Sequence, residues 1–175
     1  KPVNTIFGGL LNSPPPQPNI NYMASKGEKV VGGGGNASIS FGQDKPGLDT
    51  SGMGAVGAPS DTIDLVVGRM ASANSGEGPT DGMFVGNSFA ADAARIYISR
   101  LTKIDKNFGI DKTILESAKE PARSAIGIKA DKVRIIGREG VKIITGGMKG
   151  VEGYGPKGET NSLGGKIGYA PKIFI

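Results

Sequence analysis

An eight-residue repeat between Ser124 and Gly147 constrains the fold of this chain more than any other feature. Written in rows of eight, the segment reads SAIGIKAD, KVRIIGRE and GVKIITGG. The columns align apolar residues with one another: Ala125 with Val133 and Val141, and Ile128 with Ile136 and Ile144. Apolar and polar residues nearly alternate within a row, which is the two-residue period of a strand with one buried face. The repeat therefore predicts short strands joined by turns of about three residues.

A single row of this repeat cannot bury its own apolar face, so rows must cover one another, as the rungs of β-solenoids and β-helices do. Three rows are close to the minimum for such an array, and we expect partner chains to supply the rest. The residues expected to form the assembly core are Ile128, Val133, Ile135, Ile136, Val141, Ile143 and Ile144. The side chains expected to point outward, as ladders of opposite charge, are Arg134, Lys142, Asp131 and Glu139.

The composition predicts a thin core in each chain. Gly (30 residues) and Pro (11 residues) make up nearly a quarter of the 175 residues, aromatic residues only 6%, and there is no Trp. Chains that bury so little of their own surface often gain stability by forming oligomers. The chain has no Cys and no His, which removes thiolate chemistry and the commonest general base and metal ligand. We therefore expect neither an enzyme nor a bound cofactor.

The charge pattern narrows the possible partners. The net charge of +5 comes from Lys and Arg scattered among 16 acidic residues, with no basic cluster that would track phosphates, so nucleic acid is not an expected partner. No apolar run approaches the roughly 20 residues that span a bilayer, and no signal peptide opens the sequence, so a membrane is not expected either. The start at Lys1 and the apolar end at Ile175 are typical of a processed or partly covered chain.

The distribution of residue types along the chain predicts three segments. Residues 1–60 are dominated by Gly, Pro, Asn and Ser and predict an extended arm that lies across neighbouring subunits, with a disordered tail as the alternative. Residues 61–123 predict strands separated by long loops, and residues 124–175 hold the repeat and two C-terminal strands. The fold class expected is mainly β, as a short β-helix, β-solenoid or sandwich-like set of strands with little helix.

Two strands are expected in the middle segment. In residues 61–68, Ile63, Leu65 and Val67 share one face. In residues 93–100, Ile96 and Ile98 face opposite to Arg95 and Tyr97. Residues 70–87 predict a long loop, and residues 111–120 predict a short helix ended by Pro121.

Several motifs partly match sites for small ligands. Residues 52–57 and 153–158 match the glycine spacing of dinucleotide sites, but neither leads into a helical pattern. Oxygen-bearing side chains at Asp105, Asn107, Asp111 and Glu116 partly match a calcium loop. Gly109 stands where such a loop needs an oxygen ligand, so a solvated turn is the preferred interpretation. Asp61 and Asp64 form the carboxylate pair of a hydrolase alternative, but strand alternation explains them more simply.

The repeat segment GIKADKVRIIGREGVKIITGG resembles rungs of bacteriophage virion proteins, and similar eight-residue repeats build the trimeric β-helix of contractile-tail central spikes. More loosely, DTIDLVVGR (61–69) and DAARIYISR (92–100) resemble segments of uncharacterised phage structural proteins. The resemblance implies a non-enzymatic subunit of the virion, in tail or baseplate. Such a subunit would associate with copies of itself, as a trimer, and with other virion proteins through its N-terminal arm. Alternatives are a capsid-decorating (cement) protein, a tail-associated glycan hydrolase and a receptor-binding module.

Overall fold

The computed structural model describes residues 18–32, 35–44, 60–110, 121–143 and 160–165. These residues are mainly β with few helices, as the sequence predicts. They do not form a closed β-helix. Within the same residues, no helix is long and apolar enough to cross a membrane.

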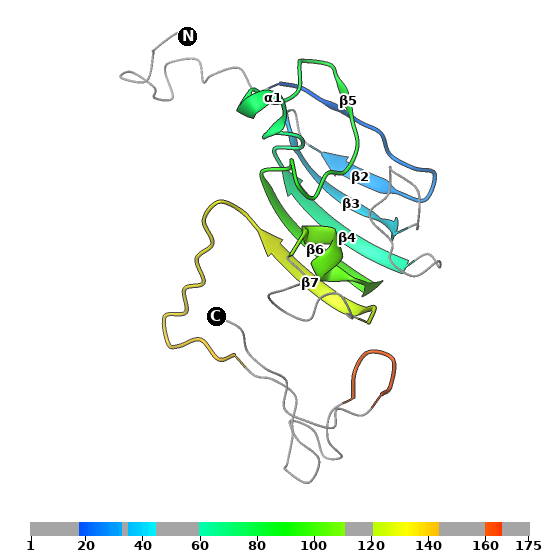
Figure 1. Cartoon of the computed structure of the whole chain (residues 1–175), viewed down its shortest axis with the longest axis vertical. Helices are drawn as coiled ribbons and strands as arrows, with labels where there is room; N and C mark the ends of the chain where they lie inside the picture. The colour runs from blue at the N-terminus through cyan, green and yellow to red at the C-terminus, as the bar shows by residue number, and fades with distance from the viewer. Residues whose placement is uncertain (1–17, 33–34, 45–59, 111–120, 144–159, 166–175) are drawn as a thin grey trace.

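A five-stranded antiparallel sheet is the centre of the described structure (Figure 1), with the strand order β2-β3-β4-β6-β7. Its strands are β2 (Lys29–Gly32), β3 (Ala37–Asp44), β4 (Ser60–Val67), β6 (Ala94–Thr102) and β7 (Arg123–Lys129). Strands β4 and β6 are the two expected in the middle segment, and β7 contains most of the first row of the repeat.

Strands β2 and β3 lie within the segment that the sequence predicts to be an extended arm. This part of the arm prediction is wrong, because residues 29–32 and 37–44 pair with each other, and β3 pairs with β4 along its whole length. The sequence pattern did not indicate β3, since its inward positions carry Ser38 and Ser40 where a strand usually carries apolar residues. Both hydroxyls accept hydrogen bonds from Arg69, which satisfies them under the sheet.

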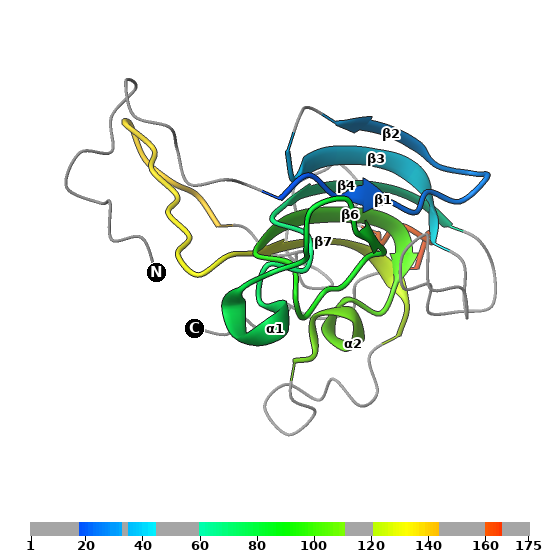
Figure 2. The same cartoon turned by 90° about the horizontal axis from the view of Figure 1, so that it is seen from above.

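Short elements and loops cover one side of the sheet, which we call the inner face (Figures 1 and 2). They include β1 (Asn21–Tyr22), α1 (Ala73–Gly76), β5 (Phe84–Val85) and α2 (Ile104–Phe108). Strand β1 pairs in parallel with β5. The expected loop over residues 70–87 thus contains a single helical turn and a short strand. The opposite side of the sheet is the outer face.

An aromatic cluster supplies the apolar part of the inner face. Phe89 lies edge-on to both Tyr97 and Phe108, with ring centroids 5.0 Å and 5.1 Å apart. Phe108 is carried by α2 and reaches the sheet over Gly127 of β7, where any Cβ atom would overlap its ring. Gly127 is therefore needed for α2 to pack against the sheet.

The chain leaves the sheet after β7. Residues 130–143, which we call the projecting segment, contain no helix or strand, and each of these residues is exposed. They extend away from the sheet (Figures 1 and 2). The second row of the repeat and the described part of the third row are thus not strands of this sheet. Several predicted features lie outside the described residues: the rest of the third row (144–147), the helix over 111–120, the glycine patterns at 52–57 and 153–158, and the strands over 166–175.

Candidate assembly surface

The outer face carries rows of aliphatic side chains that run straight across the sheet. The strand register aligns one row of Val31, Ile39, Leu65, Ile96 and Ile128. It aligns a second row of Phe41, Ile63, Ile98 and Ile126. We call these nine residues the apolar patch. Eight of them are large exposed apolar side chains, and Leu65 is half-buried. A continuous patch of this kind marks an interaction site on a soluble protein.

Exposure within the apolar patch is lowest at the centre of the sheet and rises toward both edges. Ile63, on the central strand, is 36% exposed, whereas Val31 on β2 is 53% and Ile126 on β7 is 68% exposed. At one end the patch is bounded by a polar row in which Asp61 accepts a hydrogen bond from Gln43 and lies 3.9 Å from Arg100. At the other end the row consists of Ala37, Val67 and Ala94. The projecting segment leaves β7 at this second, apolar end.

The inner face is polar at the centre, which reverses the usual burial of an amphipathic strand. Sequence alternation correctly placed Ile96 and Ile98 opposite Arg95 and Tyr97, but the structure buries Arg95 and Tyr97. Arg95 is 2% exposed and donates two hydrogen bonds to Asp64, of 3.0 Å and 3.1 Å. A further ion pair of 2.9 Å joins Arg95 to Asp92. Asp92 also accepts a hydrogen bond from the backbone N–H of Met70, which ties two loops together.

The buried charged side chains of the inner face are stabilised by contacts within the protein rather than by solvent. Burial raises the pKa of Asp64, although the neighbouring Arg95 and Arg69 act in the opposite direction. Arg69 is 1% exposed, and burial lowers its pKa. Among the described residues no carboxylate forms an ion pair with Arg69, whose guanidinium stacks 4.0 Å from the ring centroid of Tyr22. Asn87 accepts hydrogen bonds from both Arg69 and Arg95.

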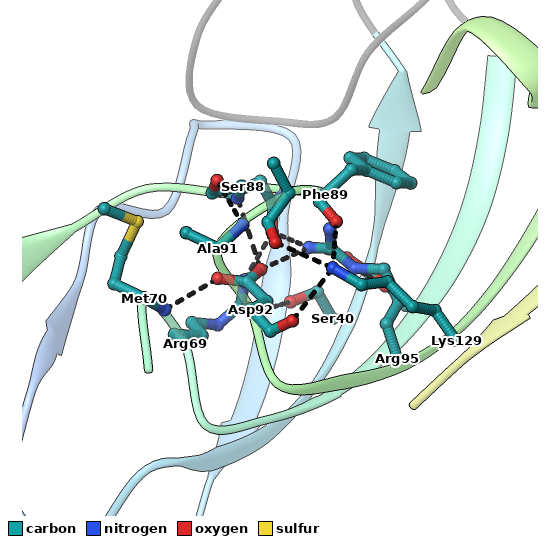
Figure 3. A network of polar contacts seen from close by, with 12 residues as sticks. Ser40, Arg69, Met70, Ser88, Phe89, Ala91, Asp92, Arg95 and Lys129 are labelled. Carbon is teal, nitrogen blue, oxygen red and sulfur yellow. Dashed lines mark hydrogen bonds and ion pairs between the residues drawn. The ribbon is translucent and has the colours of Figure 1, made fainter. Parts of the chain in front are cut away.

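Lys129 secures the last residue of β7 just before the projecting segment begins. Its ammonium group donates to three backbone carbonyls of one loop, those of Phe89 (2.6 Å), Ala90 (2.8 Å) and Asp92 (3.2 Å). Figure 3 shows Lys129 reaching this loop beside the Arg95 and Asp92 side chains. Three donors and three acceptors are matched here, which is the full capacity of an ammonium group. The base of the projecting segment is therefore fixed to the inner layer.

The projecting segment carries most of the predicted assembly residues, and their side chains are exposed. Ile136 is 85% exposed, and both Ile135 and Ile143 are 72% exposed. Val133 and Val141 are also exposed, as are the charged residues Asp131, Arg134, Glu139 and Lys142. Of the predicted core, Ile128 alone lies in the sheet, on the apolar patch, and Ile144 lies outside the described residues.

The residues of the hydrolase and calcium sites considered from the sequence do not come together in the described structure. Asp61 is exposed, whereas Asp64 is buried against Arg95. An odd spacing of three residues along β4 places the two carboxylates on opposite faces of the sheet, so they do not flank one substrate. Of the calcium candidates, Asp105 and Asn107 lie on α2, and the buried Asn107 amide donates to Thr102. Asp111 and Glu116 are outside the described residues. Within the described residues, no three acidic side chains gather as a metal site would need.

Sequence reasoning missed most of the candidate surface. The sequence predicts the apolar residues of β4 and β6 as strand faces but not those of β3, and the only assembly residue that it assigns within the sheet is Ile128. The available signal was the pairing of Asp64 on β4 with Arg95 on β6. A buried partner for each charge lets the polar side of both strands face inward, which leaves the aliphatic side to face outward.

Comparison with known proteins gave no match. No protein-family model, curated protein or solved structure matches this chain significantly.

Proposed function

We propose that this chain is a non-enzymatic structural subunit of a bacteriophage virion, in the tail or baseplate, that assembles with copies of itself as a trimer. The observation that carries the proposal is the projecting segment, on which five large aliphatic side chains are exposed to solvent. The similarity of the repeat to phage tail-spike rungs supports the virion setting. The alternative within the same class is a cement protein of the phage head.

The energetics of the projecting segment favour self-association. Burying one Val or Ile side chain stabilises an assembly by about 1.5–3 kcal/mol, and none of this is realised in the isolated chain. The second and third rows repeat the order apolar, basic, Ile, Ile at the same positions. Similar rows present similar surfaces, and equivalent surfaces from several copies can stack in register. A trimer would surround each apolar row with two like rows.

The test is the mass of the full chain in solution, measured by analytical ultracentrifugation. The wild-type chain is expected to sediment as a trimer. Ile135→Asp is expected to be monomeric, because an unpaired carboxylate would be buried between rows at a cost of several kcal/mol. Lys132→Asp is the matched control, since Lys132 is an exposed polar position three residues away. A monomeric wild-type chain, or an Ile135→Asp chain that still forms trimers, would contradict the proposal.

A second experiment tests the virion setting itself. Antibodies against the described sheet, coupled to gold, are expected to label the tail or baseplate of phage particles. Labelling of the head would favour the cement protein. Particles without label would leave self-association intact but would overturn the assignment to a virion.

A further inference from the structure

We propose that the apolar patch on the outer face is a second interface between copies of this chain, in which the outer faces of neighbouring copies pack on one another. This inference rests on the proposed self-association but uses a different surface. The projecting segment joins copies through the repeat. The apolar patch joins the bodies of the subunits.

The size of the patch is the first argument. Five strands about 4.8 Å apart, crossed by two rows about 7 Å apart, give a face on the order of 300 Å² in flat area. The largest apolar patch on an ordinary monomer covers about 300–600 Å² and is often functional. A stable interface buries about 800 Å² on each partner. The patch alone falls short of that area, so an interface through the patch also needs the contacts of the projecting segment.

Continuity with the projecting segment is the second argument. The two most exposed members of the patch, Ile126 (68%) and Ile128 (55%), lie on β7, the strand that leads directly into the projecting segment. Ile128 shares its column of the repeat with Ile136. When copies associate through the projecting segments, their β7 strands are brought together, and the most exposed part of each patch lies nearest to its equivalent.

The chemistry of the patch is the third argument. Its nine members are Val, Leu, Ile and Phe, and the nearest charges, Lys29 and Asp61, lie in flanking positions at its edge and end. A charged partner would lose its hydration here and find no opposite charge. β-Branched side chains on a flat antiparallel face are typical of the interior of a β-sandwich, where two sheets pack about 10 Å apart. A like face from a second copy provides that complement.

Single cysteines test this inference cleanly, because the wild-type chain contains none. Ile63→Cys places a thiol at the centre of the patch. In the purified oligomer we expect a short bis-maleimide, which bridges thiols about 10 Å apart, to link most Ile63→Cys chains into dimers. The matched control is Glu77→Cys, at an exposed position in the layer covering the inner face, which we expect to remain unlinked.

A charge variant measures the contribution of the patch. Ile98→Lys is expected to weaken association on the order of a hundredfold, because it would bury an ammonium group without a partner. Its far-ultraviolet circular dichroism is expected to match that of the wild type, because Ile98 is exposed in the single chain. The variant therefore tests association separately from folding.

The outcomes separate this inference from the proposed function. If Ile135→Cys in the projecting segment is linked but Ile63→Cys is not, the patch is not an interface and the proposed function stands. If Ile63→Cys is linked and Ile135→Asp is still oligomeric, the patch stands and assembly through the repeat is wrong. Equal linking of Glu77→Cys overturns the patch as the specific contact. An Ile63→Cys thiol that reacts freely in the isolated oligomer but is protected in phage particles would indicate a different virion protein as the occupant, and would also overturn the inference.

Discussion

Arg95 is the residue on which the inner face most depends. Replacing it with Met would leave the buried Asp64 carboxylate without its two hydrogen bonds. We expect the Arg95→Met chain to lose about 3–5 kcal/mol of unfolding free energy, which is the usual cost of breaking a buried ion pair on one side. Urea denaturation followed by circular dichroism measures the loss.

A double variant separates the free-energy cost of an unpaired Asp64 carboxylate from the contribution of the Asp64–Arg95 ion pair to stability. In Asp64→Leu combined with Arg95→Met, the Asp64 charge is removed together with its partner, while the buried Asp92 carboxylate loses its ion pair and keeps hydrogen bonds from the backbone N–H groups of Met70 and Ser88. We expect the double variant to recover part of the stability, because replacing a buried pair with apolar side chains is often neutral. A double variant as unstable as Arg95→Met alone would show that the network around Asp92 and Asn87 matters more than the pair.

Tyr22 makes the unfolding free energy depend on pH in the alkaline range. Burial, and then the nearby Glu28 carboxylate, raise the pKa of Tyr22 well above its usual value of about 10. The folded chain therefore keeps the phenol proton at a pH where the unfolded chain releases it. Because the folded state then binds more protons than the unfolded state, the unfolding free energy falls as the pH rises above about 10.

Tyr22→Phe tests this pH dependence. The variant loses the hydrogen bond from the phenol to Glu28, which is expected to cost about 0.5–1.5 kcal/mol at neutral pH. Above pH of about 10, its unfolding free energy should fall less steeply than that of the wild type. Chemical denaturation in a series of buffers measures both curves, and parallel curves would contradict the assignment.

Helix α2 can pack closely against β7 because Gly127 of that strand has no side chain. Gly127→Val would overlap the Phe108 ring and press against Ile104, both on α2. We expect a loss of about 1–3 kcal/mol in unfolding free energy, as is usual for overpacking. Ser124→Val is the control, because Ser124 is an exposed position on the same strand. Thermal unfolding of the two variants compares them, and equal melting temperatures would show that α2 moves aside without cost.

The elements also show what the sequence could and could not predict. Strict alternation was enough to place β4, β6 and the first row of the repeat as strands, and to divide their residues between two faces. It did not tell which face is buried, since hydrophobicity alone favours the aliphatic side. That choice is made by partners far apart in sequence, such as Asp64 with Arg95 and Arg69 with Ser38. Strand β3 was missed for the same reason, because its inward serines are satisfied by Arg69, which is distant in the sequence.

Local pattern predicts short strands in the second and third rows of the repeat, whereas residues 130–143 contain no strand in the single chain. The repeat identified which side chains need partners, and the structure leaves those side chains exposed on residues 130–143. The alternation within one row does not predict which strands pair with it. A two-residue period fits a sheet, a solenoid or a pairing between chains equally well. The assembled form of this segment therefore stays a prediction.

For the whole molecule, association is expected to carry the heat-capacity signature of apolar burial. Two outer faces that cover each other would remove on the order of 600 Å² of apolar surface from water, giving a change of about −0.3 kcal/mol per K. Dilution calorimetry of the oligomer at several temperatures measures this value. A heat-capacity change near zero would show that the contacts between copies are polar, and both proposed surfaces would be excluded.

The three hydrogen bonds donated by Lys129 also affect how the chain responds to force. A pull on the projecting segment reaches the sheet at the end of an edge strand, where hydrogen bonds to β6 would otherwise open one after another. Lys129 passes the load to the Phe89–Asp92 loop, so the strand and the loop must yield together. We expect Lys129→Met chains, pulled from the projecting segment in single-molecule experiments, to unfold at a lower force than the wild type. Equal forces would show that the edge strand bears the load without help from the loop.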